Sequence, residues 1–127
     1  MEQQWQWVRA DVALTIHNEQ IAEHGGGEGV RDAALLESAL ARPQQLLAYG
    51  DPDGAALSAA YAFGIARNHP FVDGNKRTAL AVAETFLAIN GMALTASDAQ
   101  VVVAFVALAA GELSEEELAD WLREHLG

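Results

Sequence analysis

The sequence contains no cysteine, few basic residues and no long hydrophobic run. Without cysteine, neither disulfides nor thiolate metal sites can form. No run approaches the ~18 apolar residues that a membrane span requires. The N-terminal stretch MEQQWQWVRADV lacks the basic and apolar regions of a signal peptide. We therefore expect a cytoplasmic protein that does not contact a membrane.

Basic residues are scarce: 7 Lys and Arg face 18 Asp and Glu, for a net charge of −11. Such a surface would repel a phosphate backbone, so we expect no direct binding of nucleic acid. Lys76-Arg77 is the only place where two basic residues are adjacent. The length of 127 residues, half of them hydrophobic, is typical of one globular domain with a real core. We expect residues 1–127 to form that single domain.

The hydrophobic pattern is helical throughout and favours an all-α fold of about six helices. The first expected helix spans 5–24, with Val8, Val12 and Ile16 on its apolar stripe, and the glycines from Gly25 onward end it. Asp32 is expected to cap a second helix to about Leu40, which Pro43 interrupts before a short turn at 44–49.

The second half of the sequence predicts four further helices. Asp51-Pro52-Asp53 opens one that runs to Asn68, with small residues that permit close packing. After a break at 69–74, a helix begins at Asn75 and ends before Gly91. Capping boxes at Ser97 with Gln100 and at Ser114 with Glu117 begin the last two helices. The first of these, VVVAFVALAA, is so apolar that we predict it to be the central buried helix, and the second to end near Leu126.

The segment HPFVDGNKRTAL, 69–80, has the composition of a phosphate site at a helix N-terminus. The amides of Gly74, Asn75, Lys76 and Arg77 would begin that helix, where unpaired N–H groups attract anions. Two cations at this end of a helix are unfavourable unless an anion binds there. Nearby, Asp73 is a candidate ligand for Mg²⁺ and His69 a candidate proton acceptor. Together these residues indicate phosphoryl-transfer chemistry.

The same segment resembles the signature of the Fic/Doc family, H-x-F-x-[D/E]-G-N-x-R-x-x-R, at His69, Phe71, Asp73, Gly74, Asn75 and Arg77. The likeness extends over the chain in length and helical layout. It implies a compact Fic/Doc-type helical bundle with a short Gly-rich flap and an enzyme that transfers part of ATP, with Mg²⁺, to a protein hydroxyl. It also implies that His69 is the base, that Asp73 ligates Mg²⁺, and that Phe71 shapes the loop. The four residues from Gly74 to Arg77 would bind phosphates.

A Gly-rich stretch upstream of the motif resembles the flap of Doc-type proteins. By that resemblance the flap would hold the target segment in extended form through backbone pairing. Its residues are Gly25, Gly26, Gly27, Glu28, Gly29, Val30 and Arg31. A Walker-type phosphate loop is excluded here, because the Lys-Ser/Thr ending and the preceding strand are absent.

Two departures from the signature bear on which part of ATP is transferred. Leu80 stands where adenylyl-transferring members have a second arginine, which favours the Doc-like reaction, transfer of the γ-phosphate. Doc toxins phosphorylate elongation factor Tu and stop translation, so that protein is the expected acceptor and a cognate antitoxin the expected partner. Gly74, where phage-type Doc has alanine, keeps adenylyl transfer as the alternative. A non-catalytic module that binds a nucleotide or a partner is a third reading, which His69 and Asp73 disfavour.

The remaining histidines, His17, His24 and His125, lack metal-ligand spacing, and structural or surface roles are expected for them. The stretch TIHNEQ, 15–20, is the nearest to the inhibitory motif of Fic enzymes, [S/T]-x-x-x-E-[G/N], but it lacks the final Gly or Asn. Inhibition is therefore expected to come from a separate protein.

Overall fold

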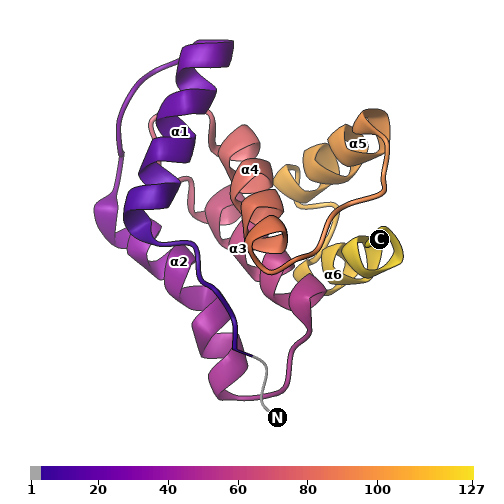
Figure 1. The fold of residues 1–127 in the computed structure, drawn as a ribbon. Helices are drawn as coiled ribbons and strands as arrows, with labels where there is room; N and C mark the ends of the chain where they lie inside the picture. Colours follow the sequence, from indigo (N-terminus) through magenta and orange to yellow (C-terminus); the bar gives the residue numbers. More distant parts are fainter. Residues whose placement is uncertain (1–3) are drawn as a thin grey trace.

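A computed structural model describes residues 4–127, which fold into helices without any strand (Figure 1). This confirms the predicted all-α class. None of the helices in this part of the chain combines the length and apolar character that crossing a bilayer requires. The six helices are α1 (Ala10–His24), α2 (Ala33–Ala48), α3 (Gly54–Asn68), α4 (Asn75–Ile89), α5 (Asp98–Ala109) and α6 (Glu115–Glu124).

Helix α3 is the central helix, with α2, α4, α5 and α6 all packed against it (Figure 1). Most of its residues are buried, because alanine and glycine on several faces let neighbouring backbones approach. A Cβ added at Gly64 would lie only 3.1 Å from the Cα of Ala39 in α2. The small residues of this helix therefore set the close α2–α3 contact, as the sequence predicted.

The prediction that α5 is the buried helix at the centre is wrong. Only Val101, Ala104, Phe105 and Leu108, spaced as one helical face, are buried. Val102, Val103 and Val106 are 58%, 70% and 54% exposed. High hydropathy did not reveal that α5 lies at the edge of the bundle and has neighbours on one side only.

Helix α1 begins at Ala10, later than predicted, and residues 4–9 form neither helix nor strand. Tertiary contacts hold this segment: the Val8 N–H donates to the Tyr61 hydroxyl at 2.9 Å, and Trp5 and Trp7 lie against Phe86. The buried face of α1 also differs from the predicted stripe. It consists of Ala13, His17 and Ile21.

Helix α2 continues through Pro43, so the predicted interruption and separate turn are wrong. A proline inside a helix removes one backbone hydrogen bond and strains the preceding turn. Burial offsets this cost here, because Leu36, Ala39, Leu40 and Pro43 itself form the face that packs on the centre of the molecule.

The predicted cap at Asp32 and the two predicted capping boxes are confirmed. Helix α3 begins at Gly54, later than predicted, with Asp53 as its N-cap, so Pro52 lies before the helix and not in its first turn. Gly91 follows α4 with a φ of 78°, the left-handed conformation for which glycine is suited. Helix α6 ends at Glu124, slightly before the predicted end, because Leu126 pairs with Leu94 in an isolated bridge.

Candidate phosphate-binding site

The loop between α3 and α4 brings most residues of the motif to one hollow. This hollow has a volume of about 340 Å³. Its lining consists of His69, Val72, Asp73, Gly74, Asn75, Lys76 and Arg77. An imidazole, a carboxylate, two cations and the start of a helix therefore share one small space.

His69 sits where α3 ends and takes a left-handed conformation, with φ 49° and ψ 55°. Its N–H still donates to the carbonyl oxygen of Ile65 at 3.2 Å, which closes the last turn. Pro70 follows and prevents continuation of the helix, since the residue before a proline avoids helical geometry. His69 is the only described non-glycine residue with positive φ. This bend places an exposed imidazole at the rim of the hollow.

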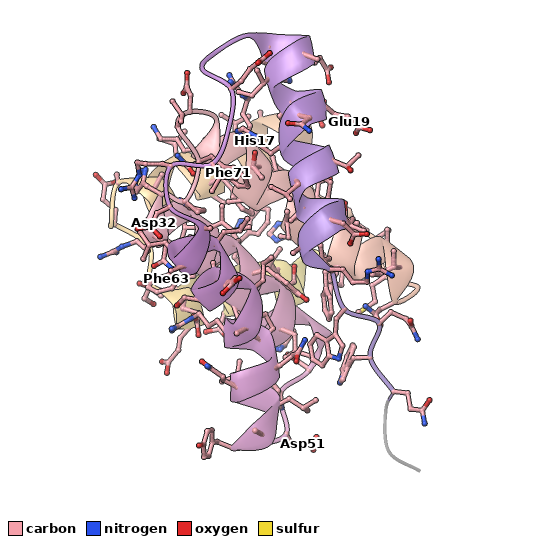
Figure 2. All side chains as sticks on the ribbon, turned by 90° about the vertical axis from the view of Figure 1, so that its left-hand side faces the viewer. His17, Glu19, Asp32, Asp51, Phe63 and Phe71 are labelled. Carbon is pink, nitrogen blue, oxygen red and sulfur yellow. The ribbon has the colours of Figure 1, made fainter. Side chains whose placement is uncertain are left out.

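The loop is braced by side chains of α1 and α4. Figure 2 shows the α1 residue, His17, beside Phe71 of the loop. Asn75 accepts from the Phe71 N–H and donates to the Phe71 carbonyl oxygen, both at 3.0 Å. The buried Phe71 ring stacks on His17, with 3.9 Å between centroids and 6° between planes. The Nε2 of His17 lies 2.8 Å from the Asp73 carbonyl oxygen. The Asn75 side chain is therefore occupied by the loop, and only the Asn75 backbone amide is available to a ligand.

The N-terminus of α4 opens into the hollow. Gly74 precedes the helix with φ 74°, and the first helical bond runs from the Thr78 N–H to the Gly74 carbonyl oxygen at 2.9 Å. The amides of Asn75, Lys76 and Arg77 come before that bond and have no helical acceptor. No acidic residue lies in the first turn of α4 to balance these N–H donors. The amides, the helix dipole and the two cations are all features that favour binding of an anion at this end of α4.

The Arg77 guanidinium is held over the hollow by the flap. Its Nη2 donates to the Gly25 carbonyl oxygen at 3.1 Å. Its Nε is buried and has no hydrogen-bond partner among the described residues. A buried donor without a partner is costly, so an anion at this place would find a donor already oriented and desolvated.

Asp73 carries an exposed carboxylate between the loop and the flap. Its oxygens accept from the Gly74 N–H at 2.8 Å and from the Gly27 N–H at 3.2 Å. These two amides, Gly74 first, lower the pKa of Asp73 below its ordinary value, so the group stays ionised in mildly acidic solution. No three His, Asp or Glu side chains within residues 4–127 gather into a metal site. A lone ionised carboxylate fits Mg²⁺ whose other ligands are phosphate oxygens and water.

The flap, Gly25 to Arg31, lies against this loop in antiparallel pairing. The Val72 N–H donates to the Gly29 carbonyl oxygen at 3.0 Å, and the Arg31 N–H donates to that of Pro70 at 2.8 Å. Val30 and Phe71 face each other between these bonds. Because backbone groups alternate along an extended segment, the N–H and C=O of Val30 point to the opposite edge. Glu28 is exposed beside that edge.

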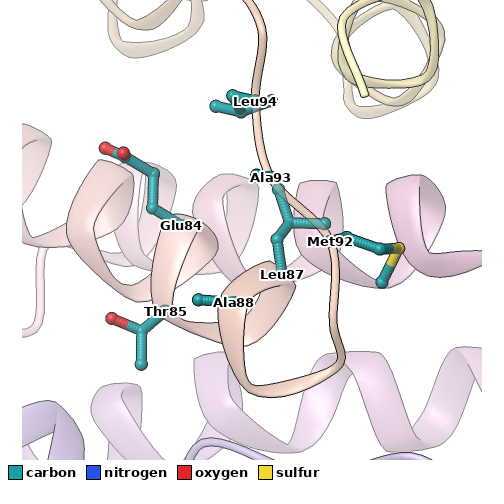
Figure 3. A pocket seen from close by; sticks show the side chains of 7 residues that line it. All are labelled: Glu84, Thr85, Leu87, Ala88, Met92, Ala93 and Leu94. Carbon is teal, nitrogen blue, oxygen red and sulfur yellow. The ribbon is translucent and has the colours of Figure 1, made fainter. Parts of the chain in front are cut away.

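A second hollow, of about 370 Å³, lies near the C-terminal end of α4 (Figure 3). Glu84 is its only charged lining residue. Burial, followed by the nearby Asp98, raises the pKa of Glu84. A carboxyl group without any cation repels phosphate, so this space does not compete for the same ligand.

The fold and the site define a family, and the comparison with known proteins agrees. Residues 7–87, more than half of the chain, match the model of the Fic/DOC family. The chain belongs to this family. It is 36% identical to "Protein kinase doc" of Escherichia phage P1 over 115 residues, 90% of each chain. It is also 52% identical to "Toxin Doc" of Mycolicibacterium smegmatis over 75 residues, 57% of each chain.

Two side chains gained their importance only from the structure. His17 is buried and braces the loop, a structural role rather than a surface one. The spacing of four between Ala13, His17 and Ile21 could have shown the buried face, but not the partner 56 residues away. Arg31, predicted as part of the flap, directs its guanidinium to the backbone at the end of α3.

Proposed function

We propose that this protein is a Doc-like toxin that transfers the γ-phosphate of ATP to a hydroxyl group of a protein. The observation that carries the proposal is the single hollow shared by the start of α4, the Arg77 guanidinium and the exposed His69. The two relatives named as a kinase and a toxin support the same reading. Residues 1–127 would act as one domain.

In this reaction His69 would be the base and the start of α4 the phosphate cradle. As the acceptor oxygen bonds to the γ-phosphorus, the bond from that phosphorus to the β,γ-bridging oxygen breaks and ADP leaves. The hydroxyl proton passes to the His69 imidazole. The amides of Asn75, Lys76 and Arg77 and the two cations would hold the phosphate oxygens, and Gly74, whose N–H donates to Asp73, would form the turn that precedes them. Mg²⁺ held by Asp73 would neutralise charge on the phosphates.

Leu80 supports γ-phosphate transfer over adenylyl transfer. It stands one turn after Arg77, half-buried and packed against the core, at the position of the second arginine in adenylyl-transferring members. An apolar side chain gives terminal phosphates nothing to bind there. Gly74 favours the opposite reaction, and it keeps adenylyl transfer as the second candidate.

Elongation factor Tu is the proposed acceptor, and a separate antitoxin the proposed inhibitor. The Val30 edge of the flap would pair with an extended segment of the acceptor. Phosphorylation of this factor would stop translation and so explain toxicity in the cytoplasm. The antitoxin would be encoded beside this protein, and its co-expression from the adjacent upstream reading frame should relieve growth arrest. Arrest that persists would contradict this partner.

Intact-mass spectrometry tests the transfer most directly. Purified elongation factor Tu is incubated with this protein, ATP and Mg²⁺, and the matched control uses His69→Ala. A gain of one phosphoryl group that is absent with the variant would agree with the kinase. A gain of one adenylyl group would favour the alternative instead.

Two further results would count against the proposal. Phosphorylation that continues unchanged with His69→Ala would remove His69 as the base. Toxicity in cells that survives the same substitution would contradict both enzymatic readings and favour a binding module. A His24→Ala variant, which changes an exposed histidine outside the motif, serves as the control for expression and folding.

A further inference from the structure

Arg31 binds the backbone at the point where the candidate base leaves its helix. Its Nε donates to the His69 carbonyl oxygen at 2.8 Å, and its Nη2 donates to the Asn68 carbonyl oxygen at 2.9 Å. Its own N–H donates to the carbonyl oxygen of Pro70, the next residue. One flap residue thus contacts three consecutive carbonyl groups around His69.

The guanidinium of Arg31 serves these carbonyls and not an acidic side chain. In the part of the chain that the structure describes, Arg31 takes part in no ion pair, although Arg9, Arg42 and Arg123 all do. Its planar fork reaches two neighbouring oxygens at once, which a lysine cannot do. The positive charge also lies at the C-terminus of α3, where the helix dipole favours a cation.

The end of α3 does not need Arg31 in order to form. Pro70 stops the helix, and the His69 N–H already closes the last turn on Ile65. The added contacts act instead on a residue in a left-handed conformation that non-glycine residues rarely adopt. Such a conformation persists where its surroundings hold it in place.

We propose that Arg31 is a positioning residue that fixes the His69 backbone and thereby aims its imidazole at the acceptor hydroxyl. The inference rests on the proposed function of this site. It assigns Arg31 a role distinct from that of the rest of the flap, which would hold the acceptor. Because Arg31 and Val30 are neighbours, one short segment sets the distance between the acceptor on the outer edge and the base on the inner one.

Steady-state kinetics of phosphate transfer test this role with Arg31→Gln and the conservative Arg31→Lys. Misplacing a base by about 1 Å can reduce a rate by up to roughly a hundredfold. We expect kcat to fall at least about tenfold in Arg31→Gln and less in Arg31→Lys, while the KM for ATP changes by less than about twofold. The matched control is Arg9→Gln, an exposed arginine that pairs with Asp11 and should leave both constants unchanged.

Amide hydrogen exchange measured by NMR tests the same inference without any acceptor. If Arg31 holds the end of α3, Arg31→Gln should speed exchange of the His69 amide at least about tenfold and shift its ring signals. Exchange in Arg9→Gln should match the unchanged protein. Because no substrate is needed, this experiment tests whether Arg31 holds the His69 backbone even if the protein transfers no phosphate.

Two outcomes would overturn the proposal. Unchanged kcat with unchanged exchange of the His69 amide would mean that the Arg31 contacts do not fix the His69 backbone. A raised KM for the acceptor with unchanged kcat would mean that Arg31 binds the acceptor and does not orient the base.

Discussion

The rings of His17 and Phe71 stack almost parallel, 3.9 Å apart, beneath the loop that carries His69 and Asp73. The two residues come from different parts of the chain, and the same histidine bonds to the Asp73 carbonyl oxygen. The loop therefore rests on a support that belongs to α1. Loss of His17 should affect both folding and catalysis, because both of these contacts with the loop would be lost.

His17→Ala should lower the free energy of unfolding by about 2–3 kcal/mol. The variant loses an aromatic stack and leaves a backbone carbonyl without its donor. Urea denaturation with linear extrapolation measures the change. His24→Ala, at an exposed position of the same helix, should stay within about 0.5 kcal/mol of the unchanged protein. Equal effects of the two substitutions would show that the stack contributes nothing specific.

Gly74→Ala should destabilise the protein more than Gly91→Ala does. Both glycines have left-handed φ, 74° and 78°, so alanine costs about 1 kcal/mol of backbone strain at either place. A Cβ at Gly91 meets nothing within 4 Å, whereas one at Gly74 lies 3.1 Å from Cδ1 of Ile21. The difference between the two free energies of unfolding measures that contact. Equal losses in the two variants would mean that Ile21 moves aside without cost.

Local signals in the sequence were enough to predict much of the fold. Helix caps depend on residues three positions apart, so Asp32 and the two capping boxes could be predicted directly. The chemistry of the motif is equally local, since His69 and Arg77 belong to one short segment. The structure gathers the whole predicted set of the motif, apart from the buried Phe71, around one hollow.

Contacts between distant segments could not be predicted in the same way. The bond from Val8 to Tyr61 holds residues 4–9 outside helix α1 despite their helical pattern. Pro43 is tolerated because α3 packs on the face that contains it. The outward valines of α5 show that hydropathy gives the apolar character of a helix but not the number of its neighbours. Each of these errors reflects tertiary packing that overrides a local preference.

Thr78→Val should leave the stability unchanged or raise it by up to about 1 kcal/mol. The Thr78 hydroxyl is buried and has no hydrogen-bond partner among the described residues. Replacing an unpaired buried hydroxyl by a methyl of similar shape removes a desolvation cost.

Ser58→Ala is the comparison for Thr78→Val. The Ser58 hydroxyl is also buried but donates to the Ala83 carbonyl oxygen at 3.0 Å. Its removal should lower the free energy of unfolding by about 1 kcal/mol. Thermal and urea unfolding of both variants measure the two changes in stability. A clear loss of stability in Thr78→Val would show that its hydroxyl has a partner, such as a bound water.

Tyr61→Phe should destabilise the protein near neutral pH and change how its stability responds to alkali. The Tyr61 hydroxyl accepts the Val8 N–H, so the variant leaves a buried donor unpaired at a cost of about 1–2 kcal/mol. Burial raises the pKa of Tyr61 above its ordinary value near 10. A raised pKa means that the phenol contributes stability below pH ~10, which is lost as the pH rises through the folded-state pKa.

The effect of Tyr61 ionisation on stability at alkaline pH is obtained by comparing the unchanged protein with two variants. The unchanged protein should lose stability above pH ~10 more steeply than Tyr61→Phe, which has no phenol to ionise at that position. Tyr49→Phe, which alters a tyrosine that is 93% exposed, should follow the unchanged protein. Urea unfolding at several alkaline pH values gives the three curves. Parallel curves for all three proteins would mean that Tyr61 ionises as readily in the folded chain as in the unfolded one, and that its burial does not stabilise the neutral phenol.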